Sequence, residues 1–179
     1  KQAALDREVL TALNINENQM GKEGFIIKSI RFKGKDILVV TANDDAGILY
    51  GVFRLLRLMQ THQELGGVAI FDTPKIDLRM LNHWDNLDRT VERGYAGFSL
   101  WNWQKLPEYI DQRYIDYARA NASIGINGTV LTNVNANALV LTPMYLEKVE
   151  ALANVFRPYG IKVYLTARFS APIEIGGLK

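Results

Sequence analysis

The segment from Ile76 to Trp101, IDLRMLNHWDNLDRTVERGYAGFSLW, joins an apolar run to a loop that is rich in aromatic and charged side chains. The run Ile76–Leu81 is typical of a strand, and the polar loop begins directly after it. A strand that ends in such a loop is how α/β enzymes commonly form sites for polar ligands. The segment therefore predicts an α/β fold with a candidate site at the end of this strand.

The same order of elements continues toward the C-terminus. The apolar pattern predicts a helix over Arg113–Ala122 and a strand over Ile126–Leu131. Thr142-Pro143 supplies an N-cap and a first-turn proline for a second helix, which Gly160 ends, and a third strand is predicted over Ile161–Thr166. This alternation indicates parallel βαβ units.

The first part of the chain predicts a separate small domain. Its expected elements are a helix, a β-hairpin and a second helix, over Gln2–Leu13, Phe25–Phe32 with Ile37–Ala42, and the apolar positions between Leu49 and Met59. Asn43, Asp44 and Asp45 offer side-chain acceptors that can cap the second helix. Turn-forming residues at Gly66-Gly67 and Thr73-Pro74 interrupt this pattern. We therefore expect one domain over residues 1–73 and another over residues 74–179.

The composition is that of an ordinary globular protein. The chain has 179 residues, of which 48% are hydrophobic and 22% charged, and its formal net charge is +2. So small a charge predicts no nucleic-acid partner and no anionic membrane partner, and no apolar run approaches the roughly 20 residues that span a bilayer. We expect a soluble protein of bacterial type, in the cytoplasm or, with a signal peptide absent from this chain, in the periplasm or outside the cell.

Metal and cofactor chemistry is not indicated by the sequence. The chain has no cysteine and two histidines, His62 and His83, which argues against a disulfide framework, a thiolate metal site and a histidine-rich one. It also lacks a P-loop, a G-x-G-x-x-G after a strand and a G-x-S-x-G elbow. We therefore expect no metal and no cofactor. The chain begins at Lys1 without methionine, which suggests a processed or partial product.

Polar side chains follow all three strands predicted after residue 73, and parallel strands end at the same edge of a sheet. We therefore expect these side chains to converge on one rim and to bind substrate there. The candidate substrate-binding residues are His83, Trp84, Asp85, Glu92, Arg93, Asn133, Asn135 and Arg168. No catalytic residue is assigned among them.

Each candidate also has an ordinary structural interpretation. Trp84 can stack on a sugar ring, or it can fill the core. The loop carboxylates resemble the acid and base of a glycosidase, but binding or loop order is the interpretation that we favour. Asn133 and Asn135 can bind sugar hydroxyls or cap a loop. The two arginines, Arg93 and Arg168, can clamp a substrate carboxylate or form structural ion pairs.

Three strings in this part of the chain resemble the α-glucuronidases of glycoside hydrolase family 67. They are RMLNHWDNL at Arg79–Leu87, ERGYAG at Glu92–Gly97 and NGTVLTNVN at Asn127–Asn135. The stretch Gly24–Leu56 is similar to the non-catalytic domain that precedes the barrel in this family and in β-hexosaminidases. The resemblance implies a small α/β domain (hairpin plus helices) followed by the first three βα units of a (β/α)8 TIM barrel, with the barrel incomplete. Arg89-Thr90 and Phe98 depart from the family pattern.

The resemblance also implies a function. Such enzymes remove α-1,2-linked glucuronic acid, or its 4-O-methyl ether, from glucuronoxylan-derived oligosaccharides by inversion, and the parent protein is expected to be a homodimer. Because the family's catalytic carboxylates lie on later strands, we expect this chain alone to be inactive. We also expect it to associate through its uncovered sheet. The alternatives are a non-catalytic carbohydrate-binding or assembly domain and a β-hexosaminidase-like fragment.

Overall fold

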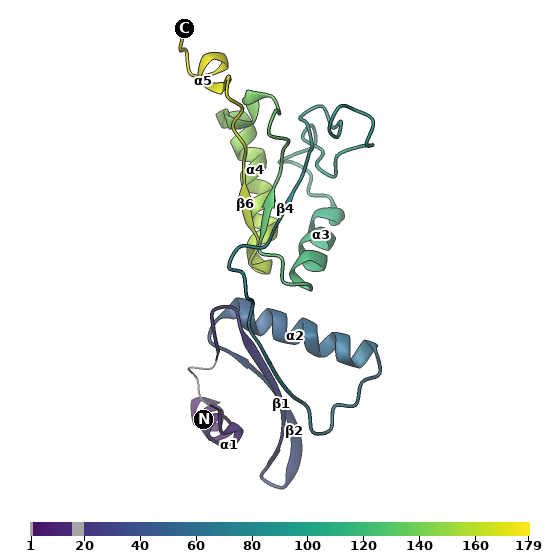
Figure 1. Cartoon of the computed structure of the whole chain (residues 1–179), viewed down its shortest axis with the longest axis vertical. Helices are drawn as coiled ribbons and strands as arrows, with labels where there is room; N and C mark the ends of the chain where they lie inside the picture. Colours follow the sequence, from purple (N-terminus) through teal and green to yellow (C-terminus); the bar gives the residue numbers. More distant parts are fainter. Residues whose placement is uncertain (1, 16–19) are drawn as a thin grey trace. The chain divides into compact units, whose positions relative to one another are not determined.

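The computed structural model describes residues 2–15 and 20–179, which form two compact units. The first unit runs through Asp77 and includes Ser123–Gly125, and the second comprises Leu78–Ala122 and Ile126–Lys179. In chain order the elements, with η for 3-10 helices, are α1 (Gln2–Leu13), β1 (Phe25–Phe32), β2 (Lys35–Ala42), α2 (Asp45–Gln60), β3 (Ala69–Asp72), β4 (Met80–Asn82), α3 (Gln112–Ala122), β5 (Gly128–Val130), η2 (Ala138–Leu141), α4 (Pro143–Phe156), η3 (Arg157–Tyr159), β6 (Lys162–Tyr164) and α5 (Ala171–Glu174) (Figure 1).

The first unit contains an antiparallel sheet with the strand order β2-β1-β3. The predicted hairpin is confirmed, because β1 and β2 pair from Phe25 opposite Ala42 to Phe32 opposite Lys35. Helix α2 begins at the predicted cap, where the Asp44 carboxylate accepts a hydrogen bond from the Gly47 amide at 2.7 Å. A side chain at Gly47 would collide with a neighbouring backbone carbonyl, so glycine lets this helix approach the sheet closely.

The second unit contains a parallel sheet with the strand order β4-β5-β6. This confirms the predicted parallel βαβ series, but each strand is shorter than expected. The strand predicted from Ile76 begins only at Met80, and the side chain of Ile76 is 65% exposed. Residues 76–79 lie outside the ladder that β4 forms with β5. The apolar run by itself therefore did not determine where the strand begins.

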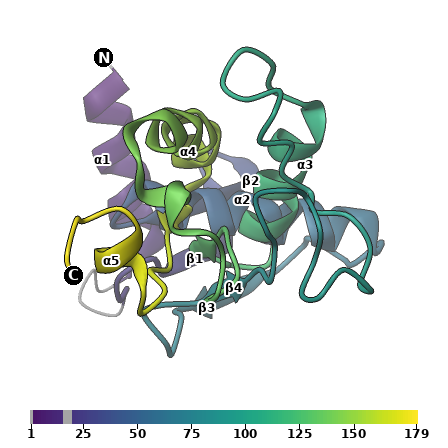
Figure 2. The same ribbon diagram turned by 90° about the horizontal axis from the view of Figure 1, so that it is seen from above.

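One face of the parallel sheet is covered by helices. The hydroxyl of Thr129 on β5 lies 2.9 Å from that of Tyr117 on α3, so Thr129 faces this helix. Gly128 faces the other way, since a Cβ there would lie 3.1 Å from the Met80 Cβ and 3.2 Å from the Tyr164 ring. Figure 2 shows α3 and α4 together on one side of β4. The other face carries Gly128, Met80 and the Tyr164 ring.

The core of the second unit is strongly aromatic. Trp101 and Trp103 are 0% and 1% exposed, and Trp101 contacts Tyr114 and Phe156 with ring centroids 5.7 and 5.8 Å apart. The α/β class is thus confirmed in its coarser form, as two small three-stranded sheets with packed helices. Across the described ranges, no helix combines the length and the apolar character that crossing a bilayer requires.

Candidate functional site

The candidate site lies where β4 and β5 end. Beyond β4 the chain stays extended, because the His83 amide donates to the Val130 carbonyl at 3.0 Å. Two residues further on, the Asp85 carbonyl accepts from the Asn133 amide at 2.9 Å. The structure therefore brings the residues after β4 and those after β5 together, as the parallel arrangement predicts.

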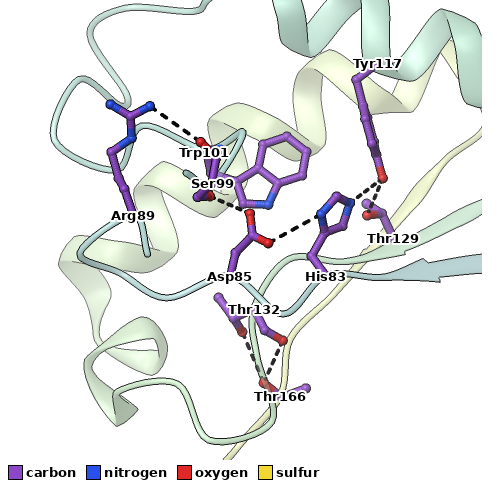
Figure 3. Close-up of polar contacts among 9 residues, drawn as sticks. All are labelled: His83, Asp85, Arg89, Ser99, Trp101, Tyr117, Thr129, Thr132 and Thr166. Atoms are coloured by element: carbon purple, nitrogen blue, oxygen red, sulfur yellow. Dashed lines mark hydrogen bonds and ion pairs between the residues drawn. The ribbon is translucent and has the colours of Figure 1, made fainter. Parts of the chain in front are cut away.

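The imidazole of His83 points toward the helices. Its Nε2 lies 2.8 Å from the Tyr117 hydroxyl, and its ring meets Trp101 edge-on at 5.1 Å (Figure 3). Burial is the main cause that raises the pKa of Tyr117 above its ordinary value of 10.0; the charge of Asp85 adds to this, and the hydrogen bond with Thr129 opposes it. The phenol therefore stays neutral and can donate at physiological pH.

The carboxylate of Asp85 is buried, with the residue only 4% exposed. The Ser99 hydroxyl donates to its Oδ2, and the same hydroxyl oxygen accepts from the Trp101 amide at 3.0 Å (Figure 3). The Asp85 Oδ1 lies 3.7 Å from the Nδ1 of His83, and this distance is longer than a hydrogen bond. His83 and Asp85 were predicted to bind substrate. Their side chains point into the second unit and bond to residues there.

Trp84 lies between these two residues and is 46% exposed. Within this chain the buried tryptophans are Trp101 and Trp103, and Trp84 lies outside their core. The Trp84 carbonyl accepts from the Glu92 amide at 2.7 Å. Its side chain is therefore accessible while its backbone is held by the loop that follows.

The loop from residue 85 to residue 99 is held by its own hydrogen bonds. The Asn86 amide group donates to the Glu92 carbonyl at 2.8 Å and to the Thr90 hydroxyl at 3.0 Å. The hydroxyl and amide of Thr90 both donate to Asp88, and these bonds hold the pKa of that carboxyl below its ordinary value. Arg89 and Glu92 adopt left-handed backbone angles, with φ of 73° and 57°.

Glu92 and Arg93 contact each other at the surface of the loop. The Arg93 side chain is 86% exposed, and its Nε lies 3.9 Å from a Glu92 carboxylate oxygen. That distance and exposure describe a weak surface ion pair. The structure thus leaves the Arg93 guanidinium in solvent and does not bring it to the residues around Asp85.

The two asparagines after β5 have different environments. Asn133 is buried, and its side-chain oxygen accepts from the Asn135 amide at 2.9 Å, which is the loop-capping arrangement of an Asx turn. The Asn135 side chain is exposed. The Thr166 hydroxyl donates to the Asn133 carbonyl at 2.8 Å, so the segment after β6 supports the loop after β5.

Arg168, after β6, is partly exposed and lies 3.3 Å from a carboxylate oxygen of Glu174. Its neighbour Phe169 is fully exposed. An open and largely apolar cavity of about 470 Å³ is bordered by both residues together with Leu141 and Ile175.

Sequence reasoning missed the supporting residues Ser99, Trp101, Tyr117 and Thr129. They lie far from His83 in the sequence, and no spacing rule connects them to it. Within the part of the chain that the structure describes, no three acidic or histidine side chains come close enough together to hold a metal ion. The arrangement is suited to presenting an aromatic surface and polar groups to a ligand.

Comparison with known proteins covers almost the whole chain. Residues 58–179 match the model of the glycosyl hydrolase family 67 middle domain, and residues 3–55 match that of the family 67 N-terminus. A probable alpha-glucuronidase A of Aspergillus terreus is 38% identical over 151 residues, which are 83% of this chain and 18% of that protein. The corresponding protein of Aspergillus niger is 33% identical over 177 residues, 98% of this chain and 20% of that protein.

A solved structure shares the fold. A GH138 enzyme targeting pectin rhamnogalacturonan II superposes with a TM-score of 0.54 at 23% sequence identity, over 80% of this chain and 22% of that chain. The chain thus spans about a fifth of the length of the proteins that it matches.

Proposed function

Because this chain belongs to glycoside hydrolase family 67, we propose that it is the sugar-holding part of an α-glucuronidase, with Trp84 as the platform for the uronic acid ring. The observation that carries the proposal is the exposed indole of Trp84 on a loop fixed from both sides. An indole face covers the C–H surface of a pyranose, and its N–H can donate to a hydroxyl or a carboxylate. Such a platform binds a sugar without taking part in bond cleavage.

The carboxylates near Trp84 support a holding role over a catalytic one. Asp85 is buried and bonded to Ser99, and Asp88 already accepts two hydrogen bonds from Thr90. Inversion requires one carboxylic acid and one carboxylate on opposite sides of the scissile bond, with room for a water molecule. We therefore assign the catalytic acid and the catalytic base to the remainder of the catalytic domain, and we expect this chain alone to be inactive.

The wider architecture follows from the same assignment. In this proposal β4, β5 and β6 are the first three strands of a (β/α)8 barrel, and the face with Gly128 and Tyr164 lines its interior. Arg168, on the same rim, is a candidate for the substrate carboxylate, which a guanidinium can bind in bidentate fashion. The substrates are glucuronoxylan-derived oligosaccharides carrying α-1,2-linked (4-O-methyl)glucuronic acid, and the parent protein is a homodimer.

Calorimetric titration of the chain with 4-O-methylglucuronic acid tests the platform. We expect weak but measurable binding that Trp84→Ala abolishes. Phe71→Ala, which removes an aromatic side chain of similar exposure in the other unit, should leave binding unchanged. Binding that survives Trp84→Ala would contradict the proposal.

An activity assay tests the division of roles. The chain should release no glucuronic acid from an aldouronic oligosaccharide that a complete family member hydrolyses. Release at a comparable rate would mean that the acid and base lie within this chain, and the assignment of its carboxylates to loop support would be wrong.

A further inference from the structure

The orientation of Trp84 is fixed by its two neighbours in sequence. His83 is anchored to α3 through the Tyr117 hydroxyl, at 2.8 Å, and Asp85 is anchored through the Ser99 hydroxyl (Figure 3). In an extended chain the side chains of residues i and i+2 point to the same side, and the residue between them points to the opposite side. Because His83 and Asp85 both point inward, Trp84 must point outward.

The backbone contacts complete this arrangement. The His83 amide donates to Val130 at 3.0 Å, and the Trp84 carbonyl accepts from Glu92 at 2.7 Å. The peptide groups around Trp84 are therefore bonded to β5 on one side and to the loop on the other. The direction in which the Trp84 side chain leaves the backbone can therefore change only if at least one of these backbone hydrogen bonds breaks.

The anchors are buried and specific. Asp85 is 4% and Ser99 is 3% exposed, and the phenol of Tyr117 also bonds Thr129 on β5 at 2.9 Å. Leaving a buried carboxylate without a donor costs free energy. The position of the Asp85 carboxylate is therefore determined by the Ser99 hydroxyl. Neither Ser99 nor Tyr117 is among the residues that we propose to touch the sugar.

From this geometry we infer that Ser99 and Tyr117 are positioning residues, which hold the Trp84 side chain in its outward direction through Asp85 and His83. The inference rests on the proposed function only in taking that ring as the sugar platform. Preorganisation of this kind raises affinity because less conformational freedom is lost on binding. Loss of either hydroxyl should leave the fold intact and let the Trp84 ring sample several orientations.

Fluorine NMR of the chain labelled with 5-fluorotryptophan tests this inference directly. The chain has three tryptophans, and Trp84 is the exposed one, so Trp84→Phe assigns its resonance. Ser99→Ala and Tyr117→Phe each delete one anchoring hydroxyl. We expect the Trp84 line to broaden or split in both variants, while Trp103, which packs on Tyr145, keeps its line and reports an intact fold.

Two further variants separate positioning from general damage. Ser170→Ala is the matched control, because Ser170 also donates to a carboxylate, that of Glu174, but lies after β6. Its Trp84 line should equal the wild-type line, and Ser99→Thr, which keeps the hydroxyl, should restore that line. A Trp84 line unchanged in both deletion variants overturns the inference. If Ser99→Ala unfolds and the Trp103 line collapses, Tyr117→Phe decides alone.

Binding of 4-O-methylglucuronic acid gives the second measurement. If the outward orientation falls to about one third of the population, the apparent Kd rises about threefold. A wild-type chain that binds no sugar would contradict the proposed platform, but the fluorine spectra would still decide whether Ser99 and Tyr117 position Trp84. A broadened Trp84 line with unchanged affinity would show that ring orientation does not matter for binding and would overturn the link to function.

Discussion

The loop after β4 and the segment after β6 meet the same rim of the parallel sheet but are held in different ways. After β4, Asp85 and Ser99 are buried and bonded to each other beneath the exposed Trp84. After β6, Arg168 makes a partly exposed ion pair and Phe169 lies fully in solvent. The loop after β4 is held by hydrogen bonds within the core of the unit, whereas the part of the segment after β6 that begins at Arg168 is held by surface contacts.

This difference has a physical basis. A hydrogen bond inside a protein is strengthened by the low dielectric around it, and an unpaired buried group is costly there. An exposed ion pair competes with water and is screened by salt. We therefore expect substitutions after β4 to change both stability and ring orientation, and substitutions after β6 to change little in the chain alone.

The largest contrast should come from two aromatic side chains. Trp101→Ala removes a fully buried ring and should lower the free energy of unfolding by about 3–5 kcal/mol, because it leaves a cavity beneath His83. Phe169→Ala should change it by less than about 0.5 kcal/mol. Urea unfolding followed by circular dichroism measures both. Equal losses would mean that the segment after β6 is part of the core and would remove the distinction.

Two serines give the next contrast. Ser99→Ala leaves the buried Asp85 carboxylate without its donor and should cost about 1–3 kcal/mol in urea unfolding. Ser170→Ala removes a hydroxyl that donates to Glu174 at the surface, and should cost less than about 0.5 kcal/mol. If Ser170→Ala proved the more costly substitution, the ranking of the two regions would be reversed.

The sequence predicted the elements that are organised locally. Asp44 and the turn after Phe32 determine a helix start and a hairpin within a few residues, and both are found where they were expected. The parallel order of the later strands also followed from the alternation of helix and strand. The predicted start of β4 was wrong, since the strand begins at Met80 and the apolar residues Ile76 and Leu78 before it are exposed.

The supports of the candidate site could not be predicted, because they depend on contacts between distant segments. Trp84 and Trp101 are each followed by a polar residue, Asp85 and Asn102, and this local pattern does not indicate that the first indole is exposed and the second buried. The partnership of Asp85 with Ser99 requires the loop to return on itself across 14 positions. Such a return is decided by packing in the core and not by propensity.

A smaller effect is expected at the ion pair after β6. Arg168→Ala should lower the free energy of unfolding by about 0–1 kcal/mol, because its contact with Glu174 is partly solvated. Raising the salt concentration should reduce the difference between wild type and variant. A loss that persisted in high salt would indicate that Arg168 is held as firmly as the residues after β4.

The smallest effect should appear in the pH dependence of stability. Burial raises the pKa of Tyr117 above 10.0, whereas the same tyrosine ionises near its ordinary value in the unfolded chain. Its contribution is therefore fully present below about pH 10 and is lost as the pH rises through the folded-state value. Between about pH 9 and about pH 11, the free energy of unfolding should fall more steeply for wild type than for Tyr117→Phe.

Tyr109→Phe, which replaces an exposed tyrosine, controls for the loss of one phenol and should keep the wild-type slope. Equal slopes for wild type and Tyr117→Phe would mean that the phenol is solvated in the folded protein. In that case the contact between His83 and Tyr117 would be as accessible to water as the ion pair between Arg168 and Glu174. The region after β4 would then be no more buried than the region after β6.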